Sequence, residues 1–478
     1  MNWYIALVCL IASCNTFTVG NDLYFILATG RYITQHGIFY EDVFSMHQGL
    51  QYQAEQWLTG VLYWNIYDIF GLFGLSVIVS LFFIFTGLVY YKLYCHYGGK
   101  GLFFPTAVLL LIGGIYATAR PQTISMFFFI LFLYAMERGK ESKKWYGVCL
   151  VCSTAIANFH GGVWFLLLGI VLSFFVQYYK EWKKYLLLLC MVVLAGMVNP
   201  YGLDMLGFAG GALAEGYHGV LVDEMRPSAL VMKNIFFQPG LFAVLGIGVL
   251  GMTYKKLELR HILLFLGYWT VSMFANRGLL QSLLLGYPAV LAAFPYSEKR
   301  EEYLYLLPVI FIPFCTAESS LYNAFFIFAG LFLLWKPKNL GGNLVLLILL
   351  LILPISHPFS MNRENTIYKP SVLKVMDEYP HGTVFSKYGS VFAYFGYRPY
   401  IDSRLEVYNI SKNKKADILG EYLAVKEGRL YFPDVVDKYK FDYILTEEGE
   451  LTDTYMRDVK GYKKIYDNNG MKLYAKIK

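Results

Sequence analysis

Long apolar runs separated by short polar segments make up the first 356 residues of the chain. A helix needs about 20 apolar residues to cross the hydrocarbon core of a membrane, and somewhat fewer when flanking residues adjust. On this basis the pattern predicts about thirteen transmembrane helices over residues 1–356. They fall near residues 2–19, 73–94, 102–118, 123–136, 145–158, 163–179, 185–198, 239–254, 261–275, 279–295, 303–317, 319–335 and 341–356. We therefore expect a polytopic α-helical membrane protein.

The pattern changes after residue 357 to that of a water-soluble domain. Short apolar stretches typical of strands alternate with stretches typical of helices, which predicts a small α/β domain over residues 357–478. The expected strands are 383–385, 443–445 and 472–475, and the expected helices lie near 412–426 and 430–438. The chain has no P-loop and no glycine-rich dinucleotide motif in the context that such a loop needs.

Composition supports a membrane protein. Of the 478 residues, 57% are hydrophobic, 18% are aromatic and 16% are charged, and the mean hydropathy is +0.45, which is far too apolar for a soluble protein of this length. The formal net charge is +7, but Lys and Arg lie in short clusters between apolar runs, so we expect no nucleic-acid partner. The seven cysteines give no disulfide framework, and we interpret the pair Cys149 and Cys152 as packing residues of a helix.

The placement of Lys and Arg predicts the orientation of the chain. Basic residues gather in alternate connections: Lys92 and Lys100, Arg138 to Lys144, Lys180 to Lys184, Lys255 to Arg260, Lys299 and Arg300, and Lys336 and Lys338. Such connections face the cytoplasm. The first apolar segment lacks the basic start of a cleaved signal peptide, so we expect a retained helix with a cytoplasmic N-terminus. An odd number of spans then places the C-terminal domain outside the cytoplasm.

The same orientation places the first long polar loop, residues 20–57, on the outer face. It carries the acidic residues Asp22, Glu41, Asp42 and Glu55 together with Arg31. A carboxylate beside the bilayer can act as a general base toward an acceptor hydroxyl, or it can hold a divalent cation. The alternative is that these residues cap helices and solvate the loop. Metal dependence stays open, a divalent cation is possible, and we expect no other cofactor.

Two arginines are also expected at outer turns, against the usual preference of cations for the cytoplasmic side. Arg120 lies in Ala-Arg-Pro-Gln, which ends at Gln122, and Arg277 lies in Asn-Arg-Gly. A charged group near the hydrocarbon core usually has a partner or a function, and a guanidinium matches the oxygens of a phosphate. A lipid-linked phosphate is therefore a candidate ligand, and interaction with ordinary lipid headgroups is the alternative.

Two further outer segments are candidates. Asn158 and His160 precede a glycine pair at a helix end, where they offer hydrogen-bond donors to a sugar hydroxyl or a phosphate. Structural capping of the helix is the alternative, and the absence of a second histidine or cysteine nearby argues against a metal site. The outer loop 203–238 is apolar enough to lie along the membrane as a lid or as an interfacial helix pair.

These motifs resemble those of the GT-C superfamily of integral-membrane glycosyltransferases. The segment from Asp22 through Arg31 to Gly37 is similar to the one after the first helix in the aminoarabinose and protein-mannosyl transferase branch. It departs from many members of that branch, which have Glu after the Asp, because Leu23 stands there instead. The later motifs look like those of uncharacterised bacterial membrane proteins, which implies the plasma (inner) membrane of a bacterium.

The resemblance implies an inverting transfer of a sugar from a polyprenyl-phosphate donor to a glycan, protein or lipid acceptor. Asp22 would be the general base, with Glu41 or Asp42 assisting, while Arg120 and Arg277 would hold the donor phosphate. The remaining candidates for substrate binding are Arg31, Glu55, Gln122, Asn158 and His160. Membrane lipids would surround the helices and the lipid tail of the donor.

Two other functions stay open from the sequence. A transporter or flippase for lipid-linked cell-envelope glycans would also need outer arginines, but it should carry charges deep in several helices. The predicted helices 163–179, 239–254 and 341–356 contain no acidic residue. A non-catalytic assembly protein would use the C-terminal domain for binding and would leave the acidic loop without a role.

Overall fold

The computed structural model of the chain describes residues 1–16, 19–205, 239–275, 278–297, 367 and 369–477. It contains two compact units. The helical unit is Met1–Thr18 with Leu72–Asn365, and the loop–sheet unit is Val19–Gly71 with Thr366–Lys478. Several predictions lie outside the described residues: Arg277, nearly all of the loop 203–238, and the spans 303–317, 319–335 and 341–356.

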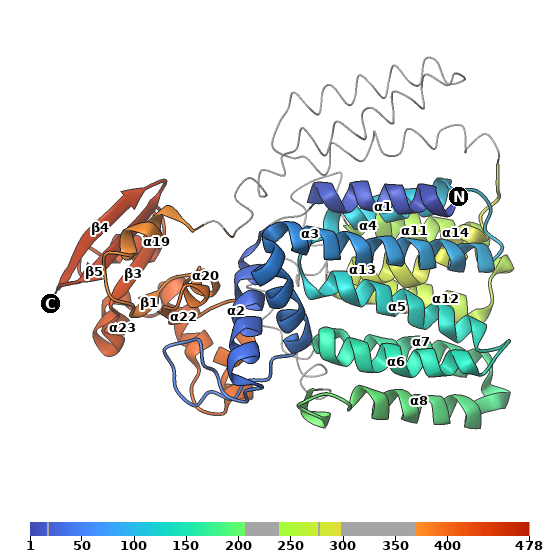
Figure 1. Ribbon diagram of the computed structural model, residues 1–478, viewed down its shortest axis with the longest axis horizontal. Coiled ribbons are helices and arrows are strands. Elements are labelled where there is room, and N and C mark those ends of the chain that lie inside the picture. Colours follow the sequence, from blue (N-terminus) through green and yellow to red (C-terminus); the bar gives the residue numbers. More distant parts are fainter. Residues whose placement is uncertain (17–18, 206–238, 276–277, 298–366, 368, 478) are drawn as a thin grey trace, which may run out of the picture. The chain divides into compact units, whose positions relative to one another are not determined.

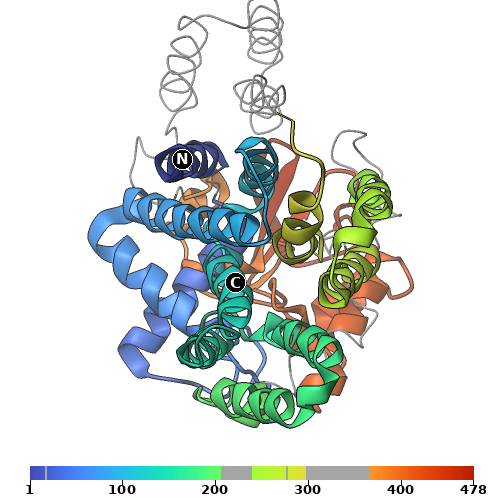
Figure 2. The ribbon, with the colours of Figure 1, turned by 90° about the vertical axis from the view of Figure 1, so that its right-hand side faces the viewer.

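The helical unit is a bundle whose helices run side by side (Figure 1), and Figure 2 shows several of them nearly end-on. Its helices are α1 (Asn2–Thr16), the later part of α3 (Trp57–His96), α4 (Phe103–Tyr116), α5 (Pro121–Arg138), α6 (Lys144–Phe159), α7 (Leu166–Gln177), α8 (Trp182–Gly196), α11 (Pro239–Thr253), α12 (Leu259–Phe274), α13 (Leu279–Gln281) and α14 (Tyr287–Ala292), with a π-helical turn at Ser282–Gly286. Helix α3 is interrupted at Gly71, where φ is 60° and ψ is −153°. This break coincides with the boundary between the two units along the chain.

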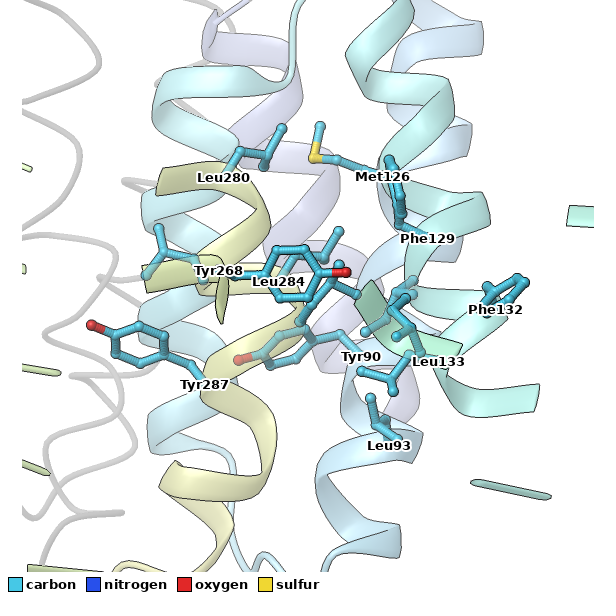
Figure 3. Close-up of a cluster of buried hydrophobic side chains, with 14 of the residues drawn as sticks. Tyr90, Leu93, Met126, Phe129, Phe132, Leu133, Tyr268, Leu280, Leu284 and Tyr287 are labelled. Carbon is cyan, nitrogen blue, oxygen red and sulfur yellow. The ribbon is translucent and has the colours of Figure 1, made fainter. Parts of the chain in front are cut away.

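Aromatic and leucine side chains fill the centre of the bundle. Tyr90 on α3, Phe129 and Phe132 on α5, and Leu284 in the π-helical turn are all buried, and Figure 3 shows them as part of one cluster. Tyr268 on α12 lies in the same cluster, and its hydroxyl donates to the carbonyl of Leu166 at 2.8 Å. An unpaired hydroxyl in an apolar core costs free energy, so this bond satisfies a polar group that the core would otherwise exclude.

A helix lies at each predicted span within the described residues, from 2–19 to 279–295. Only α3, among the described helices, is long and apolar enough to cross a membrane by itself. The pair Gly161–Gln177 and Tyr179–Gly196, bent by 106°, would add a second crossing if it formed one span. The total of about thirteen crossings therefore stays a prediction.

The loop–sheet unit joins the start of the chain to its end. Its first part contains α2 (Asn21–His36) and the part of α3 before Gly71, so the segment expected as a polar loop is helical over its first half. Its second part has a five-stranded sheet in the order β2-β1-β3-β5-β4. The strands are β1 (Thr383–Phe385), β2 (Arg398–Pro399), β3 (Tyr443–Glu447), β4 (Tyr462–Asn468) and β5 (Met471–Lys476). Strands thus occur at all three predicted positions.

Strand β1 pairs in parallel with β2 and β3, whereas β5 pairs antiparallel with β3 and β4. The helices of this part are short: α19 (Ser371–Met376), α20 (Gly389–Tyr394), α21 (Ile410–Asn413), α22 (Ile418–Lys426), α23 (Phe432–Tyr439) and α24 (Leu451–Tyr455). Helices α22 and α23 lie within or near the predicted helical stretches. Gly30 on α2 and Gly60 on α3 meet so closely that a Cβ atom at Gly30 would lie 1.9 Å from the Gly60 carbonyl oxygen.

Candidate functional site

The outer segment, residues 20–57 with their predicted position outside the cytoplasm, is held by the C-terminal sheet domain within the loop–sheet unit. Helix α2 packs on α20, and the Arg31 guanidinium donates from Nη2 to the Tyr394 carbonyl at 2.5 Å. The same guanidinium lies over the rings of Trp64 and Tyr394, 5.5 and 4.9 Å from their centroids. The Met46 amide donates to the Pro399 carbonyl at 3.0 Å, beside strand β2. Arg31, predicted to bind substrate, therefore also anchors α2.

The centre of this contact is a buried cluster of charges. Arg404 binds Asp402 through two hydrogen bonds, Nε to Oδ1 at 3.0 Å and Nη2 to Oδ2 at 2.5 Å. Its third nitrogen, Nη1, lies 2.6 Å from Oδ1 of Asp42. The side chains of Arg404 and Asp42 are 3% and 0% exposed, so water does not screen the pair. Tyr408 completes the cluster by donating to Asp402 at 2.8 Å.

Aromatic rings surround the Arg404 guanidinium. Its central carbon lies 4.6 Å from the ring centroid of Phe25, 5.2 Å from that of Phe44 and 4.7 Å from that of Tyr52. All three rings come from the outer segment, so the arginine of the C-terminal domain is enclosed by the first loop. A guanidinium is attracted to aromatic faces, and the attraction is strongest where water is excluded.

Asp42 is tied down by the loop as well as by Arg404. Its carboxylate accepts from the amides of Phe44 and Ser45, both at 3.1 Å. Burial alone would raise the pKa of Asp42, but the Arg404 charge and these hydrogen bonds lower it below its ordinary value. A carboxylate held in its charged form by a permanent cation is a poor proton acceptor. Asp42 therefore has the geometry of a residue that positions the loop, and its role as an assisting base stays a prediction.

His47 makes a second bridge between the loop and the sheet domain. Its Nε2 donates to the Tyr400 carbonyl at 2.9 Å, and its ring lies 5.2 Å from the Tyr400 ring. Burial lowers the pKa of His47, which the bond to Tyr400 opposes. A neutral imidazole with a proton on Nε2 fits this contact.

A pair of carboxyl groups lies in the same unit. Burial raises the pKa of Glu406 to about 8, and the neighbouring charge of Glu55 raises it further in the same direction. At neutral pH Glu406 is then mostly protonated beside an acidic neighbour. A carboxyl group that is protonated near neutral pH is able to act as a general acid. Glu55 was a predicted site residue, and Glu406 was not.

Asp22 and Glu41 lie outside the Arg404 cluster. Asp22 is half-buried in the first turn of α2, where a negative charge also interacts favourably with the helix dipole. Glu41 is exposed and forms an isolated antiparallel bridge with Gln51. Within the described residues no group of three or more His, Cys, Asp or Glu side chains is arranged to hold a metal ion.

The other candidates lie in the helical unit, at the ends of α5 and α6. Arg120 is the residue before α5, and Gln122 donates weakly to the Tyr116 carbonyl at 3.5 Å. Asn158 donates to the carbonyls of Thr154 and Val198 at 2.8 and 2.7 Å, so it joins α6 to the end of α8.

His160 lies at the end of α6 and is buried. Its Nδ1 is 3.0 Å from the Ser125 hydroxyl on α5. The hydrogen bonds of Asn158 and His160 match the structural alternative that the sequence left open. The structure brings Arg31, Asp42 and Glu55 into one unit with the C-terminal domain, and Arg120, Gln122, Asn158 and His160 into the other.

The residues that sequence reasoning missed are Asp402, Arg404 and Glu406. They alternate along the chain immediately after the apolar stretch that ends at Ile401. Alternating charges next to a buried strand are an unusual pattern, and this was the available signal. Their partners Asp42 and Glu55 come from the other end of the chain, which no local pattern indicates.

Two solved structures share this fold. ArnT from Cupriavidus metallidurans, bound to undecaprenyl phosphate, aligns with 99% of this chain and 97% of its own length, at 12% identity and a TM-score of 0.56. The Archaeoglobus fulgidus oligosaccharyltransferase, tethered to an acceptor peptide that contains the NVT sequon, aligns with 100% of this chain and 74% of its own, at 14% identity and a TM-score of 0.53.

Both proteins are GT-C glycosyltransferases, and the chain has the GT-C fold, which confirms the resemblance at the level of the fold. Comparison of the sequence with family models gives no match, and comparison with curated proteins gives none.

Proposed function

We propose that this protein is a membrane glycosyltransferase that transfers a sugar from a polyprenyl-phosphate-linked donor to an extracytoplasmic acceptor with inversion. The observation that supports it most is the alignment of nearly the full lengths of this chain and of ArnT, which was solved with undecaprenyl phosphate. A likeness over both the helical part and the C-terminal part is more demanding than a likeness of helices alone. The oligosaccharyltransferase, which was solved with a tethered acceptor peptide, has the same fold.

The organisation of the loop–sheet unit is consistent with a site at the first outer segment. The Arg404 cluster, Arg31 and His47 fix this segment at three places, which lowers the entropy of any group that it presents. Asp42 is part of the Arg404 cluster, where it pairs with the guanidinium. Of the predicted acids this leaves Asp22, Glu41 and Glu55 to face a substrate.

Asp22 remains our candidate for the base. It would take the proton from the acceptor hydroxyl as the acceptor oxygen attacks the anomeric carbon of the sugar. The bond from that carbon to the phosphate oxygen breaks with its electron pair, and polyprenyl phosphate leaves. Attack opposite to the leaving group inverts the configuration. Arg120 as a ligand of the donor phosphate stays a prediction from the sequence.

The test uses the full chain in lipid nanodiscs with a panel of polyprenyl-phosphate-linked sugars and, as acceptor, the extracted envelope glycans and lipids of a bacterium. The measured quantity is the release of polyprenyl phosphate with transfer of radiolabelled sugar. We expect release with at least one donor, and a loss of about 100-fold or more in Asp22→Asn, the usual scale of general base catalysis. The matched control is Glu41→Gln, an exposed acid of the same segment.

The outcomes are distinguishable. Normal transfer by Asp22→Asn would contradict the base assignment and leave the transferase proposal in place. Movement of intact lipid-linked sugar across the bilayer without release of polyprenyl phosphate would favour a flippase. Neither binding nor release with any donor, from protein that is folded by its thermal unfolding, would overturn the proposed function.

A further inference from the structure

A cavity opens in the helical unit at the end of α5 that is remote from Arg120. Helix α5 runs from Pro121 to Arg138, and an 18-residue helix is about 27 Å long. Near its last turn the cavity has a volume of about 740 Å³. The ends of α3 and α14 and the first turn of α12 line it. The positive-inside pattern predicts that this end faces the cytoplasm, whereas the proposed transfer takes place on the other side.

Cationic and imidazole side chains form one wall of this cavity. They are His96, Lys100, Lys140, Lys256, Arg260 and His261. Glu258 is the only carboxylate among the lining residues. Arg260 pairs with Glu258 and with the buried Glu137, and Lys140 also pairs with Glu137. The excess positive charge of the wall therefore comes from Lys100 and Lys256, and it favours an anionic ligand.

A buried carboxylate holds part of that wall in place. Glu137, in the last turn of α5, accepts from Arg260 through Nε at 2.9 Å and Nη2 at 3.1 Å. It also accepts from the Tyr97 hydroxyl at 3.0 Å and pairs with Lys140 at 3.0 Å. Because Glu137 lies behind Arg260 and Lys140, it fixes two cations without occupying the cavity. The Arg260 guanidinium is further held by the Tyr178 hydroxyl at 2.8 Å.

The remaining cations have capacity for a ligand. Lys100 and Lys256 are without a carboxylate partner among the described residues, and Lys256 has only a 3.5 Å contact to the Ala293 carbonyl. His261 is buried, and its Nε2 lies 3.6 Å from Oε1 of Glu137, beyond hydrogen-bond distance. When the imidazole is protonated, that carboxylate is its ion-pair partner. His261 thus belongs with Glu137, and the capacity of the cavity for a ligand rests on Lys100 and Lys256.

Apolar side chains also line the cavity. They are Leu257, Ala289, Ala292, Phe294 and Pro295. A free phosphate or a sulfate needs only the cationic residues. A phosphate attached to a hydrocarbon group would use both kinds of lining residue, because its anionic head meets the lysines while its first carbons lie against the apolar side chains.

We propose that this cavity, at the end of α5 remote from Arg120, binds the phosphate headgroup of a membrane lipid. The volume is within the range of small-ligand sites, about 300–1,000 Å³. Lys100 and Lys256 contact the phosphate, and Glu137 keeps Arg260 and Lys140 in position. The proposal does not depend on the proposed transferase function.

The test measures binding of single lipids to the full chain in detergent by native mass spectrometry. The probes are phosphatidylglycerol, undecaprenyl phosphate, phosphatidylcholine, and inorganic phosphate as competitor. The variant K100Q/K256Q removes two exposed cations of the cavity. The variant K92Q/K143Q removes two exposed lysines that do not line it, and is the matched control for net charge. Ala293→Phe narrows the cavity without changing any charge.

We expect phosphatidylglycerol or undecaprenyl phosphate to bind with a dissociation constant that rises about 30-fold in K100Q/K256Q and less than threefold in K92Q/K143Q. Ala293→Phe should also weaken binding. The preference between the two anionic lipids identifies the source of the phosphate. Equal losses in both lysine variants would overturn the proposal, because they would mean binding by general surface charge. Equal affinity for phosphatidylcholine, or inorganic phosphate that binds as tightly as either lipid, would overturn it as well.

Discussion

Removal of Arg404 should destabilise the loop–sheet unit more than removal of either of its partners. In Arg404→Met the carboxylates of Asp42 and Asp402 stay buried and lose their common cation. Breaking a buried ion pair from one side costs about 3–5 kcal/mol, because the remaining charge has no partner. Two remaining charges place this variant at the upper end of that range. Methionine keeps most of the side-chain volume, so the effect reports charge rather than a cavity.

Asp42→Asn is the informative comparison. Arg404 keeps its two hydrogen bonds to Asp402 in this variant, and the asparagine oxygen still accepts from the Phe44 or Ser45 amide. The loss is one charged contact, at about 1.5–3 kcal/mol. The double variant Arg404→Met/Asp42→Asn leaves no charged Asp42 without a partner. Its loss of stability should therefore be smaller than the sum of the losses in the two single variants.

The assay is hydrogen exchange of the full chain in nanodiscs, followed by mass spectrometry of peptides from residues 38–52 and 398–410. A loss of 1.4 kcal/mol in the local opening free energy speeds exchange about tenfold. We expect an acceleration of about 10³ or more in Arg404→Met and about 10–10² in Asp42→Asn. The control is Arg429→Met, which removes an arginine that is 64% exposed and paired with Glu427. If Asp42→Asn costs as much as Arg404→Met, or if the control does, the charge cluster does not hold this unit together.

Further predictions concern Glu406 and the α2–α3 contact. Since the folded pKa of Glu406 is raised from 4.5 to about 8, the native state holds an extra proton between these values, and stability should fall by about 2–4 kcal/mol as pH rises from 5 to 8. Glu406→Gln should flatten this dependence in thermal unfolding at several pH values, and an unchanged slope would refute the pKa shift. Gly30→Ala places a methyl group against the Gly60 carbonyl and should lower the free energy of unfolding by about 1–3 kcal/mol or more. The control Gly147→Ala adds a Cβ with no atom near it and should leave this free energy unchanged. Equal unfolding temperatures of the two variants would argue against the close contact of α2 and α3.

The sequence predicted local elements well where the pattern is local. The predicted strand 383–385 has the same first and last residues as strand β1 in the structure, because a short apolar run bounded by polar residues can begin and end at few other positions. The helices at the predicted spans follow from long apolar runs in the same way. The sequence did not indicate that the first outer segment packs with the last domain, since residues such as His47 and Tyr400 are 353 positions apart. Pairing at that distance depends on the whole fold.

The candidate site was predicted only in part for the same reason. Acidic residues near the first helix were correctly recognised as a cluster in sequence, but their roles depend on partners. Asp42 meets Arg404 and becomes a charged anchor, while the charge of Glu55 contributes to the raised pKa of Glu406. Lys100, Lys140 and Lys256 were interpreted as orientation signals, and the structure brings them together around one cavity. The distribution of Lys and Arg along the sequence predicts which side of the membrane a connection faces, but it does not predict which side chains lie next to each other in the fold.

The assembly of one unit from the two ends of the chain has a consequence for biosynthesis. Synthesis proceeds at about 5–20 residues per second, so roughly 20–70 s separate the appearance of Asp42 from that of Arg404. During that time the rings that enclose Arg404 have no cation, and Asp42 has no partner. A nascent chain that stops short of residue 404 leaves this surface open, with aromatic groups exposed to chaperones and proteases. Completion of the polypeptide is then itself the event that closes the unit.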